Sequence, residues 1–235
     1  MASTTVPAAQ VWETPEVPAH GTAFWNSLPD SSPARNVKRI FTDAEVLALG
    51  LDDHARKSTE EKLRFLLQLV EQKLETAEAA AASAPNGLRQ TDWSLWVNIT
   101  AAIFELQHTL NMPEADTTLG KLVSNGKDGG KNYAFVYQLA RVKLQRGQYN
   151  EAEELAKETL PWMQNHEILG KDSPQALGTH RIILQALAKQ GRTDEARAMA
   201  DATKALIDGM NNGRYSKYQE EEKVELENTV KELSL

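Results

Sequence analysis

A seven-residue pattern occurs twice in the second half of the chain, at an offset of 44 residues. The copies begin at Gly147 and Gly191, and an alanine follows five positions later in each, at Ala152 and Ala196. A glycine tolerates the positive φ of a tight turn between helices, and a small residue lets the second helix approach the first closely. Self-similarity at a fixed period indicates stacked units of one kind, so we expect helical hairpins here.

Apolar periodicity predicts helices on both sides of each copy. The predicted helices cover 132–146, 150–167, 173–190, 193–208 and 215–233. Asn150 followed by Glu153 matches a capping box, and Ser173 is a cap residue before Pro174 at a first helical position. The last predicted helix suits a terminal cap. We expect its glutamates to form a solvated face: Glu220, Glu221, Glu222, Glu225 and Glu227.

The first half of the chain predicts one further antiparallel hairpin. After Ser58, apolar residues recur at helical spacing: Leu63, Leu66, Leu67, Val70, Leu74 and Ala77. A second helix is predicted from Thr91 or Asp92, which are cap residues. Residues 111–131 are predicted to be a loop, with one short helix around 119–123.

The N-terminal segment is predicted to be an irregular arm rather than a folded domain. Five of the nine prolines precede residue 34: Pro7, Pro15, Pro18, Pro29 and Pro33. Proline lacks a backbone donor and interrupts regular helices. Phe24, Trp25 and Leu28 form an apolar group that we expect to dock on the chain's own helices, with a partner-binding motif as the alternative. The expected organisation is an arm (1–41), an N-terminal helical region (42–130) and helical repeats (131–235).

Charge and composition narrow the classes of partner. Lysine and arginine number 26 against 33 aspartates and glutamates, a formal net charge of −7. Because phosphate binding requires clustered basic side chains, this balance argues against a general nucleic-acid-binding protein. The absence of cysteine excludes disulfides and thiolate metal sites. No apolar run reaches the roughly 18 to 20 residues needed to cross a bilayer. We therefore expect a soluble, cytoplasmic protein without a cofactor and without a membrane partner.

The hairpin residues resemble the tetratricopeptide repeat. The matching positions are Leu139, Ala140, Gly147, Tyr149 and Ala152 in the first copy and Leu184, Gly191 and Ala196 in the second. The second copy departs from the family at Thr193, where an aromatic residue is preferred. The linking segment 166–174 is similar to that of the longer kinesin-light-chain-like repeats, and the offset agrees with that branch. The resemblance implies an all-α stack of antiparallel helical hairpins.

The resemblance also implies a concave groove, lined by the first helix of each hairpin, that holds a peptide. The residues that map to this groove are Tyr137, Arg141, Gln145, Arg181, Gln185 and Lys189. Three cations on one face suit an acidic peptide or a free carboxylate, whereas the alternative is that they are ordinary solvated helix residues. The chain lacks the full lysine and asparagine pattern of the family's chaperone-tail clamp, so chaperone binding is not predicted.

An enzymatic function is the less favoured interpretation. The five histidines are scattered without metal-ligand spacing, and no nucleophile elbow or dinucleotide fingerprint is present, so no catalytic or metal-binding residue is assigned. Trp93, Trp96, His108 and Trp162 are candidates for a pocket between the two helical halves, with His108 the first candidate base. The leading hypothesis is a protein- or peptide-binding scaffold. The alternatives are an enzyme or small-molecule binder using that pocket, and a self-associating structural subunit.

Overall fold

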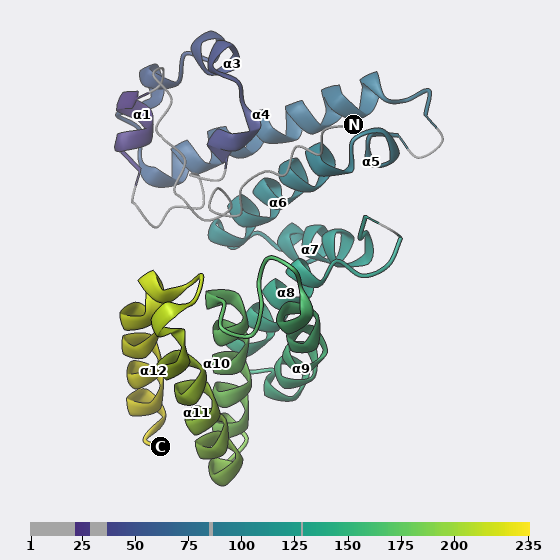
Figure 1. Cartoon of the computed structure of the whole chain (residues 1–235). Helices are drawn as coiled ribbons and strands as arrows, with labels where there is room; N and C mark the ends of the chain where they lie inside the picture. The colour runs from purple at the N-terminus through teal and green to yellow at the C-terminus, as the bar shows by residue number, and fades with distance from the viewer. Residues whose placement is uncertain (1–21, 29–36, 85–86, 128) are drawn as a thin grey trace. The chain divides into compact units, whose positions relative to one another are not determined.

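The computed structural model describes residues 22–28, 37–84, 87–127 and 129–235, which form helices and contain no β-strand (Figure 1). The chain divides into two compact units, Met1–Leu122 and Val123–Leu235. The expectation of an all-α fold is therefore confirmed for the described residues. The prolines of the predicted arm lie outside them.

Unit 1 is built on a hairpin of two long helices, α4 (Thr59–Ala80) and α6 (Trp93–Thr109), joined through the short α5 (Leu88–Thr91) (Figure 1). Ser58 caps α4 in a capping box with Glu61, and the Asp92 carboxylate accepts a hydrogen bond from the Leu95 amide at 2.9 Å. Both predicted starts are confirmed. The helix predicted around residues 119–123 is α7 (Glu114–Ser124), which is longer than predicted.

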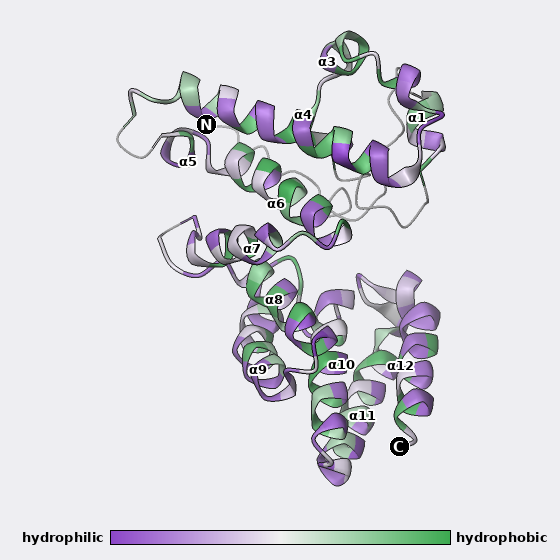
Figure 2. Ribbon diagram, turned by 180° about the vertical axis from the view of Figure 1, so that it is seen from behind, coloured by the Kyte–Doolittle hydropathy of each residue, from purple (hydrophilic) through white to green (hydrophobic). Residues whose placement is uncertain are grey.

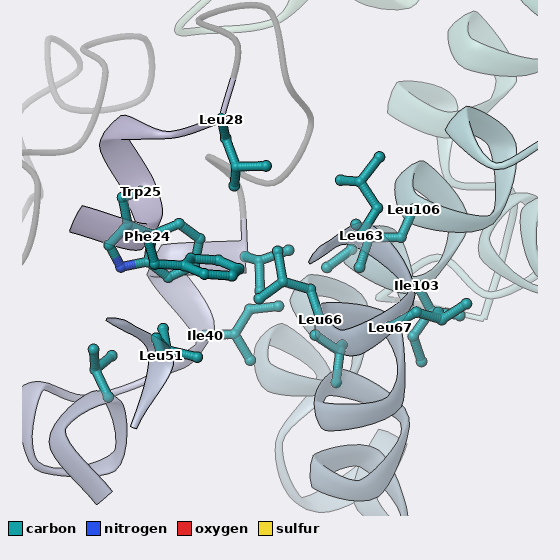
Figure 3. Close-up of a cluster of buried hydrophobic side chains, with 14 of the residues drawn as sticks. Phe24, Trp25, Leu28, Ile40, Leu51, Leu63, Leu66, Leu67, Ile103 and Leu106 are labelled. Carbon is teal, nitrogen blue, oxygen red and sulfur yellow. The ribbon is translucent and has the colours of Figure 1, made fainter. Parts of the chain in front are cut away.

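The apolar group at Phe24 docks on the helices of unit 1, as expected. Phe24 and Trp25 belong to α1 (Thr22–Asn26) and Leu28 follows it, so this part of the predicted irregular arm is helical. Phe24, Trp25 and Leu28 are buried in one cluster with the apolar stripe of α4 and with α6 (Figure 3). Short elements complete the cluster: η2 (Lys38–Ile40), α3 (Asp43–Ala48) and η3 (Leu51–His54). The Asp52 side chain accepts a hydrogen bond from the Phe24 amide at 3.0 Å, which anchors α1 to η3.

Unit 2 is a succession of helices whose boundaries agree with the predicted ones to within about two residues, except that the last helix begins at Gln219, four residues later than predicted. They are α8 (Tyr133–Gln145), α9 (Tyr149–Asn165), α10 (Pro174–Lys189), α11 (Thr193–Asp208) and α12 (Gln219–Leu233), with the 3₁₀ turns η4 (Gly209–Asn212) and η5 (Ser216–Tyr218) between the last two. Helix α9 contacts α8 and α10, and α10 also contacts α8, α11 and α12. Hydrophilic and hydrophobic residues alternate along α9, α11 and α12, as expected of helices with one face in a core (Figure 2).

The repeated residues occupy equivalent structural positions. Gly147 and Gly191 follow α8 and α10 with φ of 75° and 77°, a conformation that favours glycine. Ala152 and Ala196 lie in the first turns of α9 and α11 and are completely buried. The predicted role of the glycine in the turn is confirmed, and both alanines are buried, as close helix packing requires.

Two expectations about glutamates are wrong. Helix α9 begins at Tyr149, and the Glu153 carboxylate accepts hydrogen bonds from Lys157, Gln190 and Arg192 instead of closing a capping box with Asn150. Glu222 is buried rather than part of a solvated face. In both cases a partner distant in sequence binds the carboxylate, which a local pattern does not reveal.

Candidate functional site

Helix α10 contacts both α8 and α12. We use the name first-helix face for a set of residues on these three helices, the six that the resemblance maps to a groove together with Gly178 and Glu222: Tyr137, Arg141, Gln145, Gly178, Arg181, Gln185, Lys189 and Glu222. A Cβ placed on Gly178 would lie 2.9 Å from Tyr137 Oη and 3.8 Å from Arg181 Nη2. The ends of the Tyr137 and Arg181 side chains therefore both lie near the backbone of Gly178.

Arg181 is ion-paired within the protein. Its Nη1 donates a hydrogen bond to Oε2 of Glu222, which α12 contributes from 41 residues further along the chain. The side chains of Arg181 and Glu222 are 15% and 7% exposed. Charge-assisted pairs of arginine with carboxylate are among the strong polar contacts in proteins. The sequence predicts a cation open to a ligand at this position, whereas the folded chain supplies a carboxylate of its own.

The exposed cations of the first-helix face are Arg141 and Lys189. Arg141 Nη1 donates a hydrogen bond to Gln138 Oε1 at 3.2 Å, and its guanidinium lies 6.0 Å from the centre of the Tyr137 ring. Lys189 ends α10 and Gln145 ends α8, both exposed, while Gln185 is partly buried. Of the six predicted residues, Arg181 is ion-paired, Arg141, Gln145 and Lys189 are exposed, and Tyr137 and Gln185 are partly buried.

The four residues of the predicted pocket belong to different units. Trp93, Trp96 and His108 lie on α6 in unit 1, and Trp162 lies on α9 in unit 2. Trp96 is buried against α4, and His108 stacks on Phe104 with ring centres 5.6 Å apart. Trp162 contacts two aromatic rings of its own unit, Tyr133 at 5.7 Å and His166 at 4.9 Å. Each of these contacts lies inside one unit.

His180 is a core residue, which the sequence pattern did not lead us to predict. It is buried on α10, with Nε2 lying 3.4 Å from Gln164 Nε2 of α9 and Nδ1 lying 3.4 Å from Thr203 Oγ1 of α11. Burial lowers the pKa of this imidazole, which favours its neutral form. The sequence feature that indicates this burial is the position of His180 in a strongly apolar helix, near Leu177, Ile183 and Leu184. Its role is to join three helices of unit 2.

The described residues contain neither a membrane-spanning helix nor a cluster of metal-ligating side chains. None of the helices there is long and apolar enough to span a membrane. No group of three histidine, cysteine, aspartate or glutamate residues in the same part of the chain lies close enough to hold a metal ion. Comparison of the chain with protein-family models, with curated protein sequences and with solved structures gave no match.

Proposed function

We propose that the protein is a non-catalytic binding module, a stack of tetratricopeptide-like helical hairpins, which holds a carboxylate-bearing segment of a protein partner on its first-helix face. The proposal draws on the repeated turn, on the packing of α10 against both α8 and α12, and on the charges of this face. In such a module recognition depends on side chains presented by successive first helices, and no chemical step is required.

The observation that carries the proposal is the pairing of Arg181 with Glu222 next to Tyr137. A carboxylate is already bound on the face, and it comes from the terminal helix. Arg141 and Lys189 add positive charge on exposed positions. A partner carboxylate can bind at these two residues, or it can compete with Glu222 for Arg181.

If a partner's carboxylate competes with Glu222 for Arg181, the affinity of the protein for that partner should be modest. Displacing a buried carboxylate breaks a desolvated pair, and the incoming group must replace its contacts. Binding at the exposed Arg141 and Lys189 displaces no buried carboxylate. These two residues therefore steer an acidic partner toward the face. Their removal should therefore reduce binding without affecting the core.

The test is a selection of random linear peptides, displayed on phage, against the whole protein. Peptides enriched in aspartate and glutamate are expected, and their affinity should fall at least about tenfold for the double variant Arg141→Glu, Lys189→Glu. The matched control is Arg197→Glu, Lys204→Glu, which changes the same charge on exposed positions of α11. Selected peptides that bind the first variant as tightly as wild type, or that lose equal affinity for the control, would remove the first-helix face as the site.

A further inference from the structure

Unit 1 contains a cavity of about 350 Å³ that is separate from the first-helix face. Its walls come from α4, α6 and α7, which are labelled in Figure 1. Helix α4 contributes three carboxylates and Leu74, α6 contributes Trp96 and Ile103 with two polar side chains, and α7 contributes two further polar side chains. A cavity of this size holds a small organic group.

The α4 wall is acidic. Glu71, Glu75 and Glu78 line the cavity at spacings of four and three residues, which places them on one side of the helix. At a rise of 1.5 Å per residue they extend over roughly 10 Å. Lys121 of α7 is the basic residue among the lining side chains, so carboxylates outnumber it. The negative charge therefore extends along one side of α4.

The floor of the cavity is apolar and contains an unsatisfied hydroxyl. Trp96 and Ile103 of α6 are buried there, and Leu74 of α4 is partly buried. Thr100 lies between them on α6 and is 3% exposed, and its Oγ1 has no hydrogen-bond partner. Buried hydroxyls are normally paired, so the Thr100 hydroxyl retains its capacity to form a hydrogen bond with a group that is not part of the chain.

Two further polar groups of the cavity, Thr118 and Gln107, are paired with each other. Thr118 Oγ1 of α7 donates a hydrogen bond to Gln107 Oε1 at 2.7 Å, and both side chains are buried. Burial raises the pKa of Glu71, the neighbouring carboxylates of Glu75 and Glu114 raise it further, and a hydrogen bond with Gln107 opposes them. Glu71 is thus a carboxylate in a negative environment, which a bound cation would relieve.

We propose that this cavity binds an alkylammonium group, with its methylene stem on Leu74, Trp96 and Ile103 and its charged head among Glu71, Glu75 and Glu78. Apolar contact for the stem and carboxylates for the head are the two requirements of such a ligand, and Trp96 adds an aromatic ring. The same chemistry occurs in a lysine side chain of a partner and in a free linear amine. The site lies in unit 1 and does not depend on the function proposed for the first-helix face.

The experiment is isothermal titration of the whole protein at low ionic strength with two probes, 1,4-diaminobutane and N-acetyl-lysine N-methylamide. We expect saturable binding of at least one probe, with affinity reduced at least about tenfold in the double variant Glu75→Gln, Glu78→Gln. Both glutamates are exposed, so the fold should persist. The matched control is Glu220→Gln, Glu221→Gln, which removes two exposed carboxylates from α12 and should bind as wild type does.

Thr100→Val provides a second, uncharged test, because it removes the unpaired hydroxyl while keeping the side-chain shape. It should weaken probe binding without lowering the melting temperature. Preference for the diamine would identify a free amine as the ligand class, and preference for the lysine derivative would identify a partner's lysine. Binding weaker than about 1 mM for both probes, or an equal loss in the α12 control, would overturn the proposal.

Discussion

The guanidinium of Arg181 in α10 and the carboxylate of Glu222 in α12 form an ion pair that is largely removed from solvent. The pair joins the terminal helix α12 to α10. It also places a carboxylate on the face where the sequence predicts an acidic ligand. Its removal therefore tests both the stability of unit 2 and the function proposed for this face.

Glu222→Gln is expected to destabilise the protein by about 3 kcal/mol, because it leaves the Arg181 guanidinium buried without a counter-charge. Urea unfolding of the variant beside wild type measures the loss. Glu225→Gln, one turn away on an exposed position, should change stability by less than about 0.5 kcal/mol. Acidic peptides selected on wild type should bind Glu222→Gln more tightly, since the competing carboxylate is gone. Equal stability of the variant and wild type would show that the pair contributes little.

Ala152→Leu is expected to cost about 1–3 kcal/mol by overpacking the contact between α8 and α9. Ala152 is completely buried, so the added atoms have no solvent to enter. Thermal unfolding measures the effect, and Ala196→Leu should behave in the same way at the second hairpin. Ala198→Leu is the control, since Ala198 is exposed on α11. An unchanged melting temperature for Ala152→Leu would contradict the assigned packing.

Gly178→Ala is expected to separate binding from stability. The new Cβ would lie 2.9 Å from Tyr137 Oη, the far end of a side chain that is able to move. Alanine is favoured over glycine in a helix by about 0.5–1 kcal/mol, which offsets the cost of the shift. Stability should therefore stay close to that of wild type while affinity for acidic peptides falls. Restored affinity in the double variant Tyr137→Phe, Gly178→Ala would identify the hydroxyl as the group in conflict.

Glu153 is expected to make folding stability depend on acid pH. Burial acts to raise the pKa of its carboxyl, but the hydrogen bonds from Lys157, Gln190 and Arg192 prevail and hold that pKa below the ordinary value of 4.5. A carboxyl with a lowered pKa in the folded state stabilises above its unfolded pKa, and this contribution disappears as the pH falls through the folded pKa.

The measurement is the urea midpoint of wild type and Glu153→Gln at pH 7 and at pH values below 4.5. Wild type should be the more stable protein at pH 7, and the difference should shrink as the pH falls. A difference that does not change with pH would assign the effect of Glu153 to packing instead of charge.

The helices and their ends follow from local sequence. Ser58, Asp92 and Ser173 each accept a hydrogen bond from an amide three residues ahead, and Gly147 and Gly191 adopt a backbone conformation that the residue type favours. These interactions span three to five residues, so the residue pattern contains both partners. Amphipathic spacing also predicts which side of each helix faces the core.

The candidate sites depended on tertiary structure. Glu153 and Glu222 have the same local appearance as solvated helix glutamates, and they differ because Arg192 and Arg181 reach them from 39 and 41 residues away. The acidic spacing of Glu71, Glu75 and Glu78 was visible in the sequence, but the cavity they line exists only where α6 and α7 pack against α4. Local sequence determined where this chain is helical and which faces are apolar, because those preferences act over a few residues. The fold alone decided which charges are buried, paired or left lining a cavity, because burial and long-range partners are properties of the packed helices.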